Sequence, residues 1–301
     1  MAKKSKRLGE FEELPEACIA VILSHTTPID ACSLSLVSKT LHSASESDDV
    51  WNYFLPSDSN FLNSIIPQSP SLANAPTKKA LFIALSDRPI VIDNGKKIFQ
   101  LGRKSGKISY MLPAKSLTIE YKNGGARRKK KANSMLDSRF PEVTELYNVL
   151  RFEIRGTINT PSLSPNTNYA AYLVFKMNGY DGFKNQPAEL SVGVEDGSYI
   201  NKSVCLDPYF SYPETGHHHH RRYHSGRRGR QTVCKCLRLP KPRLVGLKRP
   251  CVRTDGWFEI EMGKFFNSSL EDKQVRMSVV QKQGCGKMEN FFLEGIQVRP
   301  K

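Results

Sequence analysis

Long apolar runs are missing from this sequence, since nothing in its 301 residues approaches the roughly 18 consecutive apolar side chains that cross a membrane. No apolar signal core follows the N-terminal lysines. Cysteine is also sparse, with seven residues scattered along the chain, an odd number that disfavours a disulfide framework. We therefore expect a soluble protein with reduced thiols, located in the cytoplasm and nucleus and without a membrane partner.

Signatures of catalysis are missing as well. The sequence has no G-x-S-x-G nucleophile turn, no phosphate-cradling glycine loop and no pair of histidines at helical spacing. Glu259 and Glu261 would share one face of a strand, with no second acid group opposite them. The residues favour a protein with no cofactor and no enzymatic activity of its own, and nothing specific supports a hydrolase.

What the sequence does contain is a compact helical block at residues 11–55. The pair Leu14-Pro15 suits a helix start, because proline fixes φ and lacks an amide hydrogen that would be unpaired there. After a break at Pro28, we expect Asp30 to cap a second helix. A block this small cannot build a large core, which favours a docking module, with a subdomain packed on the rest of the chain as the alternative. The apolar residues expected on the second helix are Leu34, Leu36, Val37 and Leu41.

This block resembles an F-box. Leu-Pro, paired aliphatics, Pro-x-Asp, Leu-x-x-Val-Ser-Lys and a late Trp occur in the order of that motif. The resemblance implies docking on the Skp-type adaptor of a cullin-based ubiquitin ligase, with apolar helices seated in a groove of the partner. The residues that it assigns to adaptor binding are Leu14, Pro15, Ile22, Leu23, Leu34, Val37 and Trp51.

Beyond the block, the sequence pattern changes twice. Residues 56–95 hold five prolines among serines and asparagines, which predicts a connector with one short helix near residues 78–85. From residue 90 onward apolar residues alternate between turn signals, which indicates an antiparallel sandwich or barrel and disfavours a doubly wound nucleotide-binding fold. The clearest strands are predicted at residues 108–112, 116–121, 149–158, 169–177, 189–194, 256–262, 274–280 and 291–298.

Five phrases in this second region resemble the phloem protein 2 family of plant lectins, also called Nictaba-like. They are GKISYML at residues 106–112, DSRFPEV at 137–143, FEIRG at 152–156, DGWFEI at 255–260 and EGIQVRPK at 294–301. The resemblance covers residues 96–301. It implies a β-sandwich of jelly-roll type that binds N-acetylglucosamine oligomers and N-glycan cores.

The sugar contacts of that family are altered in this chain. Tyr121 stands where the family has a first tryptophan, and the second falls in a basic run. Gln281 and Lys287 stand where many members have a glutamate and a tryptophan. We expect binding of chitin oligomers to be weak or missing, because a lysine or arginine cannot replace an indole against an uncharged sugar. Tyr121 is the one carbohydrate-binding residue that we name, with a structural strand-end tyrosine as the alternative, and we assign Trp257 to the core.

Positive charge is concentrated in two segments of this chain, whose net charge is +16. Residues 103–139 carry eleven basic and two acidic side chains, and residues 214–253 carry twelve and one. We expect solvated loops, with nucleic acid an unlikely partner and with polyanion binding, nuclear import through residues 127–131, or an acidic ligand at the altered sugar site as alternatives. Four histidines at residues 217–220, followed by Cys234 and Cys236, provide no fixed geometry, so we expect no metal site.

These features predict a mostly β chain with three parts. They are an F-box module at residues 11–55, a connector at 56–95 and a lectin-like sandwich at 96–301. The implied function is the substrate-recognition subunit of an SCF-type cullin E3 ubiquitin ligase that selects a glycoprotein or protein target. The alternative is a carbohydrate- or polyanion-binding lectin-like protein that acts outside a ubiquitin ligase.

Overall fold

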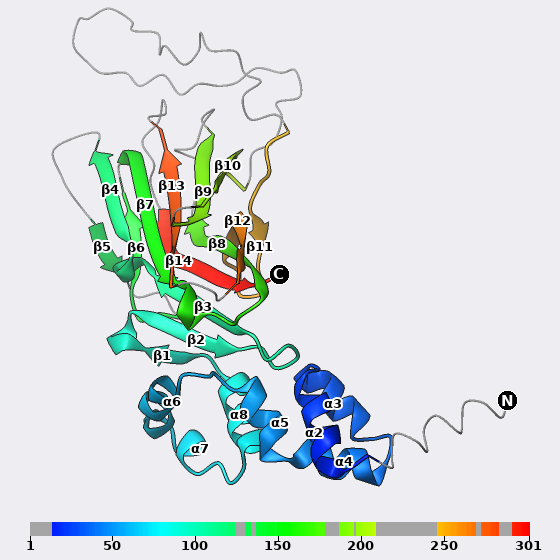
Figure 1. Cartoon of the computed structure of the whole chain (residues 1–301). Helices are drawn as coiled ribbons and strands as arrows, with labels where there is room; N and C mark the ends of the chain where they lie inside the picture. The colour runs from blue at the N-terminus through cyan, green and yellow to red at the C-terminus, as the bar shows by residue number, and fades with distance from the viewer. Residues whose placement is uncertain are drawn as a thin grey trace, which may run out of the picture.

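A computed structural model gives the arrangement of the chain (Figure 1). It describes residues 14–123, 130–133, 137–147, 149–177, 187–195, 197–208, 246–268, 272–282 and 291–301. A block of short helices lies at the N-terminal end, and a body of antiparallel strands stands on it. The predicted class, mostly β with a small helical N-terminal part, is confirmed. In the described part of the chain, no helix combines the length and apolar character needed to cross a bilayer.

The predicted helical block consists of α2 (Glu16–Ser24), α3 (Pro28–Leu34), α4 (Lys39–Glu46) and α5 (Asp48–Phe54). Thr27, not Asp30, caps α3 by accepting a hydrogen bond from the Asp30 amide, and its hydroxyl donates back to the Asp30 carboxylate at 2.6 Å. The predicted second helix is in fact two helices, because α3 ends at Leu34. Leu36 and Val37 therefore lie in the turn before α4.

Residues 56–95 are helical to a greater extent than predicted. The expected helix is α8 (Lys78–Asp87), but α6 (Ser59–Ile65), the short 3-10 helix η1 (Ile66–Gln68) and α7 (Pro70–Ala73) precede it. The prolines of η1 and α7 lie in first turns, where a missing amide hydrogen costs nothing. The prediction of a single short helix was therefore wrong, because proline here begins helices instead of excluding them. The bounds of the connector stay a prediction.

Helix α8 joins the core of the helical block. Phe82 is 2% exposed, and its ring centroid lies 5.2 Å from that of Trp51 and 6.2 Å from that of Phe54. The Trp51 indole N–H donates to the Ser45 carbonyl at 2.7 Å, so this buried side chain leaves no polar group unpaired. These aromatic residues close a core that α2 to α5 could not build alone.

Two antiparallel sheets form the β body. The sheet of five strands has the order β10 (Tyr199–Val204), β9 (Ala188–Val194), β13 (Gln274–Gln281), β7 (Val149–Asn159) and β4 (Thr118–Asn123). The larger sheet has the order β1 (Ile90–Ile92), β2 (Lys97–Leu101), β3 (Ile108–Pro113), β14 (Phe291–Pro300), β8 (Thr167–Met177), β12 (Phe258–Asn267) and β11 (Cys251–Val252). Beside β14 lies β6 (Val143–Leu146), which pairs in turn with β5 (Lys130–Asn133). Short 3-10 turns occur at η2 (Asp93–Gly95), η3 (Ala114–Ser116) and η4 (Thr160–Ser162).

All eight predicted strands are present, as β3, β4, β7, β8, β9, β12, β13 and β14. Alternation made β7 recognisable, since its buried Phe152 and Ile154 alternate with the exposed Arg151 and Arg155. Strands β8 and β14 are instead buried along almost their whole length. Trp257 is fully buried, as expected, and its indole N–H donates to the Asp137 carbonyl at 2.9 Å.

A buried carboxylate anchors the segment before β6. Glu294 of β14 is 0% exposed and accepts hydrogen bonds from the Arg139 amide at 2.8 Å and from its guanidinium at 2.7 Å. The Ser138 hydroxyl donates to the same carboxylate at 3.2 Å. These bonds fasten the DSRFPEV segment to the outer face of the larger sheet and give Ser138 and Arg139 a structural role.

The helical block is joined to the β body by a continuous apolar core. Phe61 of α6 packs on Phe99 of β2 with ring centroids 5.1 Å apart, and buried residues of both parts belong to the same cluster. In the loop between β2 and β3, the Lys104 carbonyl accepts a hydrogen bond from the Ile29 amide at 3.4 Å. A side chain at Gly106, whose φ is +67°, would come within 3.2 Å of Pro28. The helices are therefore fixed in position on the strands.

Candidate docking face and candidate sugar site

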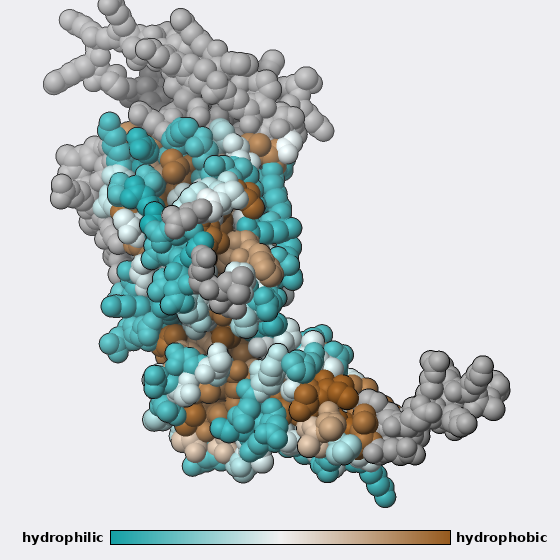
Figure 2. Space-filling model, in the orientation of Figure 1, coloured by the Kyte–Doolittle hydropathy of each residue, from teal (hydrophilic) through white to brown (hydrophobic). Residues whose placement is uncertain are grey.

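The N-terminal helices expose several large apolar side chains. The exposed fraction runs from 38% at Leu14 to 87% at Leu36. Figure 2 shows apolar surface gathered over α2 and α3, close to the N-terminal end. We call this surface the docking face, and its exposed apolar side chains are Leu14, Val21, Ile22, Ile29, Leu36, Val37 and Tyr53.

The fold of each helix explains why these side chains point outward. In α2 the buried positions are Ile19, Ala20 and Leu23, so the neighbouring Val21 and Ile22 lie on the opposite, solvent side. Leu36 and Val37 are presented by the tight turn between α3 and α4. Tyr53 is held beside α2 because its ring packs edge-on against His25, with centroids 5.1 Å apart.

The predicted adaptor-binding residues divide into two groups. Leu14, Pro15, Ile22 and Val37 are exposed and available to a partner. Leu23 and Trp51 are 0% and 1% exposed and support the face from beneath, and a contact of either with the adaptor stays a prediction. Leu34 is half-buried and packs against the core. The motif therefore mixes residues that offer a surface with residues that build it.

Four exposed side chains of the docking face were not assigned to it from the sequence: Val21, Ile29, Leu36 and Tyr53. A signal existed for Val21 and Ile29, because an aliphatic residue out of phase with the buried positions of its helix must face solvent or a partner. Residue spacing alone does not show which side of a helix packs on its neighbours. The buried side of each helix therefore could not be predicted from the sequence.

The candidate sugar residue Tyr121 lies near the end of β4. Its cross-strand neighbour is Phe152 of β7, which is paired in turn with Gln281 of β13. Phe152 and Gln281 are 1% and 5% exposed, so this row of the sheet faces inward, and Tyr121 is half-buried against the core. Packing alone thus accounts for Tyr121, and its sugar stacking stays a prediction. Lys287, the histidine run at residues 217–220, Cys234 and Cys236 lie outside the described residues.

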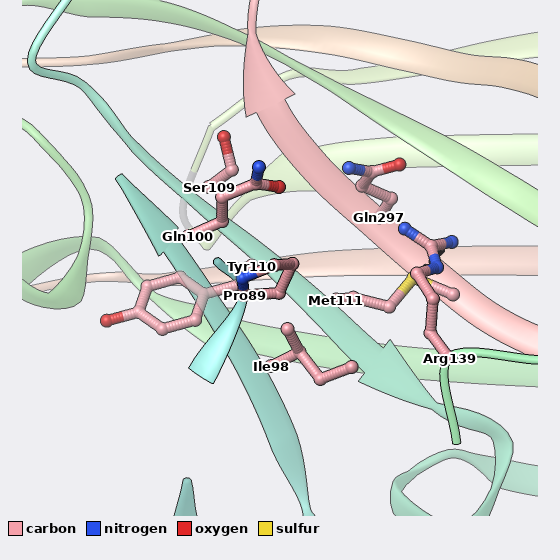
Figure 3. Close-up of a pocket in the computed structure, with 8 residues that line it drawn as sticks. All are labelled: Pro89, Ile98, Gln100, Ser109, Tyr110, Met111, Arg139 and Gln297. Atoms are coloured by element: carbon pink, nitrogen blue, oxygen red, sulfur yellow. Dashed lines mark hydrogen bonds between the residues drawn. The ribbon is translucent and has the colours of Figure 1, made fainter. Parts of the chain in front are cut away.

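A small cavity lies on the outer face of the larger sheet, close to the helices. Figure 3 shows Gln100 and Ser109 along one side of it, with Met111, Arg139 and Gln297 along the other. Its volume of about 30 Å³ admits about one or two water molecules, whereas a typical ligand site has roughly 300 Å³ or more. A sugar ring does not fit there without rearrangement of the lining residues.

The comparisons with known proteins agree with this two-part architecture. Residues 107–300 match the phloem protein 2 family, and residues 11–53 match the F-box domain. Over 319 residues the chain is 35% identical to F-box protein PP2-B1 of Arabidopsis thaliana, with 98% of this chain and 91% of that protein covered. The chain belongs to the F-box proteins of the phloem protein 2 family. Two further Arabidopsis relatives are 38% identical: F-box protein PP2-B13, with coverage of 95% and 98%, and F-box protein VBF, with coverage of 96% and 99%.

Membership of the family explains the division of the molecule. The F-box match ends at residue 53, inside α5, and the phloem protein 2 match begins at residue 107, at the start of β3. Helices α6 to α8 and strands β1 and β2 lie between the two matches. In this F-box protein the intervening segment carries Phe82 and Phe99, and it therefore supplies the packing that unites both domains.

Proposed function

We propose that this F-box protein is the substrate-recognition subunit of an SCF-type cullin E3 ubiquitin ligase. The docking face would bind the Skp-type adaptor, and the β-sandwich would bind the target. The observation that carries the proposal is the exposure of Leu14, Ile22 and Val37 over a sealed core, because exposed aliphatic side chains clustered on short helices suit a groove in a partner.

In this role the protein contributes to ubiquitin transfer by position and not by chemistry. Binding of a target and an adaptor to one rigid body raises the effective concentration of the target near the transferring subunits. The continuous core between the helices and the sandwich supports such rigidity. We place the complex in the cytoplasm and nucleus, where cullin-based ligases would meet reduced, intracellular targets.

For the target, we favour a protein surface over the ordinary glycan of the family. Tyr121 packs against the core, and the cavity lined by Met111 and Arg139 is too small for a sugar ring. We expect weak or no binding to chitin oligomers on a glycan array. Strong binding there that resists added salt would instead favour the lectin function outside a ubiquitin ligase.

The docking face is tested by Ile22→Glu combined with Val37→Glu. The matched control is Ile83→Glu with Val91→Glu, because these side chains are 42% and 50% exposed, against 42% and 55% for the test pair. Binding of purified Skp-type adaptor to the full chain is measured by calorimetry. We expect the test pair to lose about 2 kcal/mol or more, roughly thirtyfold in Kd, because carboxylates would be buried in an apolar groove.

The control pair should bind the adaptor as tightly as the unchanged chain, and both pairs should keep the same thermal midpoint. Equal affinity in both pairs would contradict docking through this face. Leu14→Ala with Pro15→Ala should also weaken capture while the sandwich stays folded. Deletion of residues 11–55 is not a suitable control, because it removes Trp51 and Phe54 from contact with Phe82.

A further inference from the structure

Four lysines from separate parts of the chain lie near one another, since the charges of Lys248, Lys264 and Lys301 all act on Lys202. Lys202 belongs to β10 of the smaller sheet, Lys264 to β12 of the larger sheet, and Lys301 follows β14. Lys248 lies beside the end of β10, where it forms an isolated backbone β-bridge with Val204. The Lys248 carbonyl accepts a hydrogen bond from the Cys205 amide at 3.0 Å. We call Lys202, Lys248, Lys264 and Lys301 the lysine cluster.

Glu261 of β12 lies at the centre of the cluster. Its side chain is 13% exposed, it forms an ion pair with Lys301, and its carboxylate lies 3.8 Å from the Lys202 ammonium group. Burial would raise the pKa of Glu261, but the hydrogen bond from Lys301 and the charges of Lys248 and Lys202 outweigh burial and hold the pKa below its ordinary value. The carboxylate is therefore ionised and surrounded by positive charge.

One carboxylate does not neutralise four lysines. Burial lowers the pKa of Lys202, and the charges of Lys248, Lys301 and Lys264 lower it further against the opposing effect of Glu261. Among the described side chains, four ammonium groups face the single carboxylate of Glu261. Such crowding is unfavourable in the free protein, and an incoming anion would relieve it.

A neighbouring group of charges shows the contrast. On the same strand, Glu259 accepts hydrogen bonds from Arg253 at 2.8 Å and from Arg299 at 2.6 Å, and Arg253 also pairs with Asp255. Two guanidinium groups therefore face two carboxylates, and their charges balance. The lysine cluster has no such balance among the described residues.

The surroundings of the cluster are open on the side of solvent. Lys248, Lys264 and Lys301 are exposed, and Lys202 is partly exposed, at 25% of its side chain. Phe266 lies two residues after Lys264 on β12, and Ile200 lies two residues before Lys202 on β10, so each shares a face of its strand with a lysine. Phe266 is 53% exposed and Ile200 is 47% exposed. A ligand here would thus meet convergent ammonium groups with an apolar margin.

We propose that the lysine cluster binds a phosphate monoester carried by a phosphorylated segment of the target protein. This inference rests on the proposed function, because it names the class of target that the sandwich would recognise. A phosphorylated side chain carries nearly two negative charges and three acceptor oxygens, which match several ammonium donors at once. Phe266 and Ile200 would contact apolar residues on either side of the phosphorylated position.

The test uses the purified full chain without adaptor, so its result is independent of the docking face. Fluorescence anisotropy measures binding of a degenerate phosphoserine peptide library and of its unphosphorylated counterpart. We expect the phosphorylated library to bind roughly tenfold more tightly, with the difference shrinking as salt rises. Equal binding of the two libraries would overturn the proposal.

Variants locate the binding. Lys202→Gln with Lys264→Gln should weaken binding of the phosphorylated library roughly tenfold. The control, Lys96→Gln with Lys122→Gln, lies elsewhere on the molecule and changes the net charge equally. It should leave the affinity for the library unaltered. Glu261→Gln should tighten binding several-fold, because it removes the one opposing charge; a purely structural role of Glu261 would predict weaker binding. Equal losses in the two lysine pairs would overturn the assignment.

Two competitors distinguish the sources of phosphate. Inositol hexakisphosphate and single-stranded RNA are each titrated against the bound phosphopeptide library. We expect the phosphopeptide to resist both at equal phosphate concentration, because only the peptide can use the apolar margin. Preferential displacement by either competitor, lost in the Lys202→Gln and Lys264→Gln variant, would overturn recognition of a phosphorylated protein in favour of a soluble phosphate or a nucleic acid.

Discussion

Replacement of Phe82 by alanine tests whether the helical block and the β-sandwich unfold as one unit. Phe82 lies in the segment that joins the two matched domains, is 2% exposed, and packs on Trp51 and Phe54. Removal of a buried phenylalanine costs about 3–5 kcal/mol, which combines lost transfer energy with the cavity left behind. The matched control is Ile83→Ala on the same helix, where the side chain is 42% exposed and the cost should stay below about 1 kcal/mol.

The two tryptophans of this chain provide separate reporters. Trp51 lies in the helical block and Trp257 in the sandwich. In a Trp257→Phe background the fluorescence follows the helices, and in a Trp51→Phe background it follows the strands. Urea unfolding is recorded in each background, with and without Phe82→Ala.

A shared core predicts coincident unfolding curves from both reporters. With a urea m-value of about 3 kcal/mol per molar, a loss of about 3 kcal/mol moves the midpoint by about 1 M. Phe82→Ala should therefore shift both reporters by this amount, and Ile83→Ala should shift neither by more than about 0.3 M. A shift seen by Trp51 while Trp257 keeps its midpoint would refute the continuous core and leave two independent units.

Three further changes probe other parts of the fold. Glu294→Ala removes the buried anchor of the DSRFPEV segment and should lower the free energy of unfolding in urea by about 3 kcal/mol. A loss below about 1 kcal/mol would contradict this role. Gly106→Val forces a side chain into a left-handed conformation against Pro28 and should cost about 1–3 kcal/mol, whereas Gly256→Val, also at positive φ but in open space, should cost less. Burial would raise the pKa of Glu259, but Arg299 and Arg253 hold that pKa below its ordinary value. The ionised Glu259 therefore stabilises the fold fully above about pH 4.5, and this contribution is lost as pH falls through the lowered pKa. Unfolding measured across an acid titration should show the loss, and the loss should be smaller in Arg299→Gln.

Much of this fold could be predicted from the sequence. Strand β7 was predictable because one face of the five-stranded sheet is buried, so that Phe152 and Ile154 alternate with charged residues. The F-box helices were predictable because their motif has a fixed order. The apolar residues were therefore identified correctly even where their final positions were not.

Proline was the signal that misled at residues 56–95. Pro67 and Pro70 favour a connector when read from the sequence, yet both lie in first turns of helices. Local propensity cannot distinguish these outcomes, because a proline that ends one helix and a proline that begins another obey the same restriction on φ. The packing of α8 on α5 and of Phe61 on Phe99 decided that this segment belongs to the core.

The chain by itself determined which residues are apolar, in what period and in which motif, since those properties are local. The tertiary structure alone decided which of them are covered: Leu23 and Trp51 became core, and Ile22 and Val37 stayed exposed. It alone brought Lys202, Lys248 and Lys301 around Glu261, although they are up to about a hundred residues apart in sequence. Burial and convergence of charge depend on which strands become neighbours, and strand pairing across long loops is a property of the folded whole.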